Sequence, residues 1–163
     1  MAKTMEGERT MKKLAALAMT GAIVGGSLLV TTTPAAAAGA ISKGTWRAYG
    51  NTNPITASSS TWKCDSSNEI YPAVVAQVCA IRSPSGDYVQ GAVIVRNNRS
   101  TLYSLRAKMN LENEDIVVGR WACESSGVGA NSWSVCFGES VRWGLVNSAG
   151  WINDEFIGAS PWI

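Results

Sequence analysis

The sequence predicts an all-β protein: an antiparallel β-sandwich, Ig-like in size, with seven to nine strands after a cleaved N-terminal signal helix. Three observations predict this fold class. Apolar and polar residues alternate through much of residues 39–163, as they do in strands that bury one face. Turn-forming residues interrupt the alternation about every 10–15 residues, a spacing typical of sandwiches and small barrels. Beyond residue 38 there is no capped helical period of ten residues or more.

Residues 1–38 have the composition of a secretory signal peptide. Lys12 and Lys13 precede a largely apolar stretch, residues 14–30, and a run of four alanines ends at Ala38. Signal peptidase requires small side chains next to the bond that it cleaves. We therefore expect cleavage after Ala38.

A membrane anchor is the alternative interpretation of this segment. The apolar run of about 17 residues is interrupted by glycines and is at the short limit for crossing a bilayer. The sequence leaves open whether Met1 or Met11 is the true start. We expect residues 39–163 to be one secreted, extracellular domain that is not attached to a membrane after signal cleavage.

All four cysteines lie in the predicted domain, at Cys64, Cys79, Cys123 and Cys136. An even number of cysteines in an exported chain predicts disulfides, and four cysteines allow three pairings. We favour the sequence-local pairs, 64 with 79 and 123 with 136, because each closes a loop of about 15 residues and contributes roughly 3 kcal/mol in the chain-entropy model. A zinc site of four thiolates is the alternative, but the chain has no C-x2-C spacing.

The first predicted elements are a loop and a hairpin. Residues 48–60 are rich in Asn, Thr and Ser and are predicted to be a loop. A hairpin is predicted over residues 73–96, with a Ser-Pro-Ser-Gly turn at residues 83–86. Its first strand, residues 73–81, is apolar on both faces and suits a central strand. The clearest alternation follows in residues 101–111, with Leu, Ala and Met on one face and Ser, Arg, Lys and Asn on the other.

Three further strands are predicted at residues 115–123, 131–137 and 141–145. Each has alternating apolar residues that include a tryptophan. We expect Trp121, Trp133 and Trp143 to point into the core. Gly, Ser and Asn predict a loop at residues 125–130 and a turn at residues 147–150.

Charge and the lack of histidine exclude several functions. The chain has 14 basic residues, 12 acidic residues and no His. From Ala40 onward there are ten basic and ten acidic side chains, so binding to nucleic acid is not expected. Without His, Ser-His-Asp and Cys-His catalysis and imidazole metal sites are excluded. No cofactor is predicted.

Carboxylates are the remaining candidates for catalysis. Glu112, Glu114 and Asp115 cluster in one predicted turn, and Asp154 and Glu155 lie near the C-terminus. Catalytic carboxylates face each other across a cleft, about 5–10 Å apart, and one of them is buried. Adjacent acids in an exposed turn are more typical of a solvated surface, so no catalytic residue is assigned. These acids also lack the alternating spacing of a calcium loop, so no metal ligand is assigned.

Seven tryptophans are the most unusual feature of the predicted domain. Trp46, Trp62, Trp151 and Trp162 lie outside the clearest strands and are the candidates for exposed binding residues. Exposed indole rings stack on sugars and anchor protein partners. A set of basic residues is interpreted as a solvated face: Arg96, Arg99, Arg106 and Lys108.

Short segments between Thr61 and Ser140 carry a family resemblance. They are Trp62-Lys63-Cys64 with Ala76-Gln77-Val78-Cys79, Gln-Gly-Ala-Val-Ile-Val-Arg-Asn at residues 90–97, and Ser-Trp-Ser-Val-Cys-Phe-Gly at residues 132–138. The chain resembles a set of small secreted actinobacterial proteins of unknown function, which share an Ala-rich signal peptide and a β-rich domain with two disulfides. The resemblance implies a fold and a compartment. It implies no catalytic residues.

These observations predict a secreted, non-enzymatic binding module whose partner is a protein, as for an inhibitor or a toxin-like effector. The alternative is a carbohydrate or cell-wall binding domain that uses exposed tryptophans. A second alternative is a carboxylate-based hydrolase. A row of exposed aromatic rings would favour the carbohydrate binder, and two opposed acids in a cleft would favour the hydrolase. We expect a monomer, and the sequence does not name its protein or glycan partner.

Overall fold

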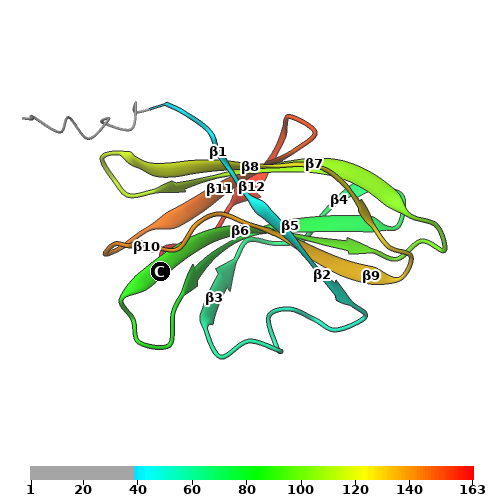
Figure 1. The fold of residues 1–163 in the computed structure, drawn as a ribbon, viewed down its shortest axis with the longest axis horizontal. Coiled ribbons are helices and arrows are strands. Elements are labelled where there is room, and N and C mark those ends of the chain that lie inside the picture. The colour runs from blue at the N-terminus through cyan, green and yellow to red at the C-terminus, as the bar shows by residue number, and fades with distance from the viewer. Residues whose placement is uncertain (1–38) are drawn as a thin grey trace, which may run out of the picture. The chain divides into compact units, whose positions relative to one another are not determined.

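The computed structural model describes residues 39–163, and the predicted signal peptide, residues 1–38, lies outside the described part. The described residues form an all-β domain with two mostly antiparallel sheets, one drawn above the other in Figure 1. None of these residues belongs to a helix with the length and hydropathy required to cross a membrane.

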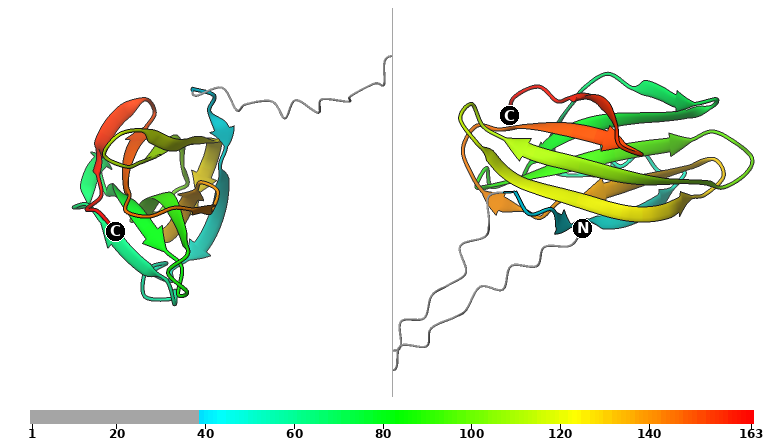
Figure 2. Two further views of the ribbon diagram at one scale, coloured as in Figure 1. Left: turned by 90° about the vertical axis from the view of Figure 1, so that its left-hand side faces the viewer. Right: turned by 90° about the horizontal axis from the view of Figure 1, so that it is seen from above.

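We name the five-stranded sheet A and the seven-stranded sheet B. Sheet A contains, in spatial order, β1 (Ser42–Lys43), β8 (Val117–Val128), β7 (Tyr103–Glu112), β11 (Asn147–Ile152) and β12 (Glu155–Ala159). Sheet B contains β2 (Thr45–Gly50), β9 (Ser132–Phe137), β6 (Tyr88–Asn97), β5 (Val74–Arg82) and β3 (Thr61–Cys64), while β4 (Asn68–Tyr71) also pairs with β5 and β10 (Val141–Arg142) with β6. Seen from above, the strands of both sheets run roughly lengthwise (Figure 2).

The twelve strands exceed the predicted seven to nine. Two of the additional strands, β1 and β10, have only two residues each. In addition, β3 and β4 pair with successive parts of the long strand β5, so that one edge of the sheet is divided between two short strands. Strands this short have no alternation that a sequence pattern can reveal.

The chain crosses from sheet A to sheet B at Gly44. Strand β1 pairs in parallel with β8, whereas β2 pairs antiparallel with β9. A Cβ atom at position 44 would lie 2.8 Å from Cys123 Sγ and 3.0 Å from the Phe137 carbonyl oxygen. Only glycine fits at so close a crossing. The β1–β8 pair is the one parallel pairing among the described strands.

The main hydrophobic core lies between the two sheets. The alternation predicted for residues 101–111 is confirmed, because Leu105, Ala107, Met109 and Leu111 are all at most 2% exposed. Side chains of β5 and β6 in sheet B belong to the same core. Burying one large aliphatic side chain contributes roughly 1.5–3 kcal/mol, so this shared core holds the sheets together.

The prediction of a turn at residues 147–150 is wrong, because these residues begin β11. Their small size reflects close packing between the sheets. A Cβ atom at Gly150 would lie 2.5 Å from Val78 Cγ2 and 3.2 Å from Val93 Cγ2. Ser148 is fully buried, and its hydroxyl donates to the Asn110 carbonyl at 2.9 Å. Small residues therefore mark a close approach of two sheets here.

Sheet B also buries apolar side chains on its outer face. Ile81, Ile94 and Val135 form part of a second cluster and are at most 5% exposed. Ile55 packs over them from the loop between β2 and β3, which lies below sheet B in Figure 1. This cluster explains why residues 73–81 are apolar on both faces.

Three predictions for the later strands need correction. Trp133 is half-buried on the outer face of sheet B, where the Arg96 guanidinium lies 5.3 Å from its ring, because the two residues are register partners there. Trp143 follows the short strand β10 and is 38% exposed. Strand β8 continues to Val128, through residues predicted to be a loop, because it stays paired with the long strand β7. Trp121 is buried as predicted, with 4% exposure.

Both predicted disulfides are present, and no cysteine is left free. Cys64 and Cys79 join the neighbouring strands β3 and β5 within sheet B. Cys123 of β8 and Cys136 of β9 join sheet A to sheet B. One bridge therefore ties strands within a sheet, and the other ties the two sheets together.

Candidate functional site

The four candidate tryptophans lie on different elements. Trp46, on β2, packs against the main core, and its indole N–H donates to the Glu124 carbonyl at 2.7 Å. Trp62, on β3, packs against the second cluster of sheet B, with its ring edge-on to Phe137 and the ring centroids 6.0 Å apart. Both of these half-buried rings stabilise the fold.

Trp162 lies after β12, at one end of the domain, and is 39% exposed. The Arg82 guanidinium donates to the carbonyls of Trp143 at 3.4 Å and Ile163 at 2.8 Å, and so it holds the last residues of the chain beside the segment that follows β10. We call the exposed side chains of Trp143, Leu145 and Trp162 the end patch.

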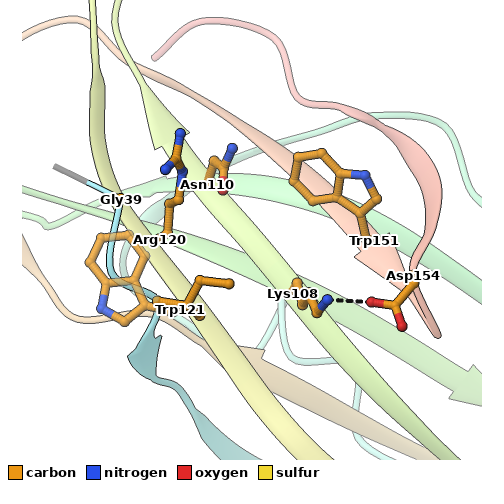
Figure 3. Close-up of a pocket in the computed structure, with 8 residues that line it drawn as sticks. Gly39, Lys108, Asn110, Arg120, Trp121, Trp151 and Asp154 are labelled. Atoms are coloured by element: carbon orange, nitrogen blue, oxygen red, sulfur yellow. Dashed lines mark hydrogen bonds and ion pairs between the residues drawn. The ribbon is translucent and has the colours of Figure 1, made fainter. Parts of the chain in front are cut away.

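Trp151 lines a groove on the outer face of sheet A. The groove has a volume of about 360 Å³ and extends from β11 across β7 to β8. The polar and aromatic residues that line it are Trp151 from β11, Asp154 from the next turn, Lys108 and Asn110 from β7, and Arg120 from β8 (Figure 3). Gly39, Ile41 and Trp121 complete the lining. We call this site the Trp151 groove.

The turn between β11 and β12 places Asp154 over β7. Asn153 and Asp154 have φ values of 47° and 73° between the paired residues Ile152 and Glu155, which is a two-residue hairpin turn of type I′. After glycine, Asn and Asp adopt this left-handed conformation most readily. The Asn153 amide donates to the Arg106 carbonyl at 3.1 Å, and the Asn153 side chain accepts from the Arg106 amide at 3.0 Å. The turn is thereby fixed to β7.

A β-bulge beside this turn places two aromatic rings at the edge of sheet A. The register between β11 and β12 shifts after Gly150, so that Trp151 pairs with Phe156 while Ile157 stays buried. The Trp151 and Phe156 ring centroids are 5.5 Å apart. Phe156 is 61% exposed, so this aromatic pair faces solvent beside the groove.

Positive charge predominates around the groove. The Asp154 carboxylate is 3.0 Å from the Arg106 guanidinium and also pairs with the Lys108 ammonium. The hydrogen bond from Lys108 and its charge, together with the charge of Arg106, lower the pKa of Asp154 below its ordinary value. Within residues 39–163, Arg120 has no carboxylate partner. Two cations therefore pair with the Asp154 carboxylate, and a third, Arg120, lines the groove without such a partner.

The structure separates the two groups of candidate acids. Asp154 is ion-paired over the middle of β7, whereas Glu112 is the last residue of that strand and accepts a hydrogen bond from Asn110 at 2.9 Å. The four residue steps from Lys108 to Glu112 span about 14 Å along a strand, which exceeds the separation of carboxylates in glycosidases. Among the described residues, no three acids or cysteines are grouped so that they could hold a metal ion.

The four basic residues expected to form one solvated face lie on three surfaces. Arg96 contacts Trp133 on the outer face of sheet B, and the Arg99 guanidinium lies 4.8 Å from the Tyr71 ring. Lys108 lines the Trp151 groove, and Arg106 is linked to it by the ion pair with Asp154.

Part of the groove is visible in the sequence pattern. The alternation of residues 101–111 identifies Lys108 and Asn110 as outward-facing, and they form the floor of the groove. Arg120 is the residue that the sequence reasoning missed. No sequence signal links it to Trp151, because the order of strands in the sheet sets their proximity.

Comparison with known proteins adds no assignment: no family model, no curated protein and no solved structure matches the chain. Its function is therefore inferred from the groove itself.

Proposed function

We propose that this protein is a secreted, non-enzymatic glycan-binding module and that the Trp151 groove binds the glycan. The observation that carries the proposal is the meeting of an indole ring with amide, ammonium and guanidinium donors and a carboxylate acceptor in one open groove. Sugars present apolar C–H faces, which stack on an indole ring, and hydroxyl groups, which donate and accept hydrogen bonds. Small-molecule sites typically combine such an apolar surface with a few placed polar groups.

The fold and the compartment are part of the proposal. Two sheets around one core support a β-sandwich, and the composition of residues 1–38 supports export. Two disulfides in so small a domain support an oxidising compartment.

The acids support binding in preference to hydrolysis. The carboxylate that lines the groove, Asp154, is held by Lys108 and Arg106, and the acids near Glu112 are at the far end of β7. A general acid would need a pKa raised by burial, and the pKa of Asp154 is lowered.

A protein partner is the second candidate, and the end patch favours it. Exposed tryptophan and leucine side chains are typical anchors of protein interfaces. Trp143, Leu145 and Trp162 are each at least 38% exposed, on segments that Arg82 holds together. This surface lies outside the Trp151 groove.

A binding experiment with two tryptophan variants distinguishes the candidates. The purified secreted protein is mixed with insoluble cellulose, chitin or peptidoglycan, and the bound fraction is measured for the wild type, Trp151→Ala and Trp162→Ala. We expect Trp151→Ala to lower affinity for the bound glycan about tenfold or more, since a buried aromatic contact is worth about 2 kcal/mol. Trp162→Ala, an exposed tryptophan outside the groove, is the matched control and should bind as the wild type does.

Two outcomes contradict the proposal. If no glycan retains the wild type, or if Trp151→Ala binds normally, the groove is not a glycan site. If Trp162→Ala loses binding to the glycan while Trp151→Ala keeps it, the end patch is the functional surface instead.

A further inference from the structure

We propose that the ligand of the Trp151 groove is an acidic saccharide, with one sugar ring stacked on Trp151 and a carboxylate of a neighbouring unit bound by Arg120. This inference rests on the proposed function and adds the chemical class of the glycan.

The charge of the groove favours an anionic ligand. Arg106 and Lys108 share the single carboxylate of Asp154. Arg120 lines the same groove and has no carboxylate partner among residues 39–163. Counting Arg106 through its ion pair with Asp154, three cations accompany one carboxylate at this site, whereas the ten basic and ten acidic side chains of residues 40–163 balance as a whole. A planar guanidinium binds a carboxylate through two parallel hydrogen bonds. Arg120 is therefore the side chain that we expect to bind a carboxylate of the ligand.

The spacing of the two anchors fits more than one sugar unit. In sheet A, Trp151 of β11 pairs with Lys108 of β7, and Lys108 pairs with Ala122 of β8. Arg120 lies two residues before Ala122, on the same face of β8. Two strand spacings of about 4.8 Å and two residue steps of about 3.4 Å place the Cα atoms of Trp151 and Arg120 roughly 12 Å apart. This is about the span of a disaccharide, so one ring can stack on the indole while the next unit presents its acid group to Arg120.

The groove floor between these anchors has the donors that such a chain requires. Asn110, the register partner of Arg120, lines the groove between Arg120 and the Lys108–Asp154 ion pair (Figure 3). Its amide and the Lys108 ammonium can donate to sugar hydroxyl and ring oxygens. Stacking at one end, hydrogen bonds in the middle and a guanidinium at the other end therefore define a polarity for the bound chain.

The test uses a ligand pair that differs only in charge. Tetragalacturonate and its methyl ester have the same sugars, but the ester has no carboxylates. Titration calorimetry at low salt should show the wild type binding tetragalacturonate about tenfold or more tightly than the ester, since charge-assisted hydrogen bonds discriminate by this amount. Rising salt should weaken binding of the acid and leave binding of the ester unchanged.

A pair of arginine variants locates the contact. Arg120→Met should lower affinity for tetragalacturonate to that for the ester and leave affinity for the ester unchanged. Arg142→Met removes an exposed arginine that stacks on Tyr88, with its guanidinium 5.5 Å from the ring and outside the groove, and it should bind both ligands normally. If Arg120→Met does not fold, the comparison of acid and ester on the wild type still decides the proposal.

Failure of this inference is distinguishable from failure of the proposed function. If acid and ester bind equally and both lose affinity in Trp151→Ala, the groove binds glycans without regard to charge and this inference alone is wrong. If Arg120→Met binds the acid normally, the carboxylate contact is wrong. If neither tetrasaccharide nor any insoluble glycan binds, the proposed function itself is wrong.

Discussion

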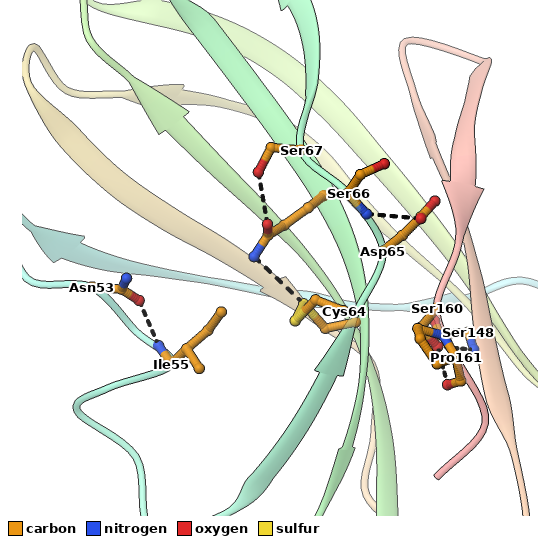
Figure 4. Close-up of a disulfide and its surroundings, with 11 residues drawn as sticks. Asn53, Ile55, Cys64, Asp65, Ser66, Ser67, Ser148, Ser160 and Pro161 are labelled. Carbon is orange, nitrogen blue, oxygen red and sulfur yellow. Dashed lines mark hydrogen bonds between the residues drawn. A yellow bond between two sulfur atoms is a disulfide. The ribbon is translucent and has the colours of Figure 1, made fainter.

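Cys123 and Cys136 are bonded across the two sheets, with their Cα atoms 6.0 Å apart. Cys64 and Cys79 are bonded instead between register partners within sheet B. Beside that second bridge, Ser67 donates to the Gln77 side chain at 2.8 Å (Figure 4). The two bridges close loops of similar length, 13 and 15 residues, yet they restrain different parts of the fold.

Removing either disulfide should destabilise the protein by a similar amount. The chain-entropy model depends on loop length alone, and it gives about 3 kcal/mol for either loop. Cys123→Ala/Cys136→Ala and Cys64→Ala/Cys79→Ala are compared by urea denaturation, which reports the free energy of unfolding. A much larger loss for the inter-sheet pair would show that native-state packing, and not loop entropy, determines the contribution of that bridge.

Asn97 is expected to be a large single contributor to stability. Its side chain is fully buried and donates to the carbonyls of Thr101, Val128 and Gly129 at 2.9–3.0 Å, while its Oδ1 accepts from the Arg99 amide at 3.0 Å. Asn97→Ala leaves these buried groups without partners, which costs roughly 2–4 kcal/mol.

The neighbouring residue provides a control for this prediction. Asn98 is exposed, and its Oδ1 accepts from Arg96 Nε at 2.7 Å near the surface. Asn98→Ala should lower the free energy of unfolding by less than about 1 kcal/mol. Chemical denaturation of both variants checks the pair, and equal losses would contradict the role given to Asn97.

The all-β class was predictable because its determinants are local. The alternation around Leu105 and Met109 depends on one strand and its buried face, and the presence of disulfides was predictable from the even number of cysteines. The pairing of Cys64 with Cys79 followed from their proximity in the sequence. That the other bridge joins different sheets was not predictable, because sheet membership is a property of the whole chain.

The errors have a common physical cause. Gly150 and Ser148 have the composition of a turn, but they are small because the opposite sheet approaches closely. Trp133 alternates correctly yet lies on the outer face, because sheet B buries both of its faces. Likewise Trp151 and Arg120 share a groove only through the order of three strands. Each case depends on contacts between segments that are distant in the sequence.

Gly150 is expected to tolerate no side chain unless Val78 is shortened. Gly150→Ala places a methyl group 2.5 Å from Val78 Cγ2, and overpacking of this kind costs about 1–3 kcal/mol. The double variant Gly150→Ala/Val78→Ala removes this clash. It should therefore lose less free energy of unfolding than the two single variants together, by about 1 kcal/mol. Thermal or urea unfolding of the wild type, both single variants and the double variant measures these losses. Gly144→Ala is the control, because nothing lies within 4 Å of the new Cβ atom. If the losses of unfolding free energy at positions 150 and 78 simply add, the two side chains are not in direct contact.

Asp154 should stabilise the folded state at neutral pH and lose this effect in acid. Because Lys108 and Arg106 lower the pKa of Asp154 in the folded protein, the unfolded chain takes up the proton first as pH falls. The contribution is therefore complete above the pKa of Asp154 in the unfolded chain, near pH 4, and disappears as pH falls through the pKa of Asp154 in the folded protein.

Asp154→Asn keeps a residue that accepts the left-handed turn conformation but removes the charge. The difference in melting temperature between wild type and Asp154→Asn should be constant from about pH 7 to pH 5 and should shrink as pH falls below about 4. Glu155→Gln, which alters an exposed acid with no ion pair among the described residues, should leave that pH dependence unchanged, and a difference that grows in acid would show that the sign is wrong.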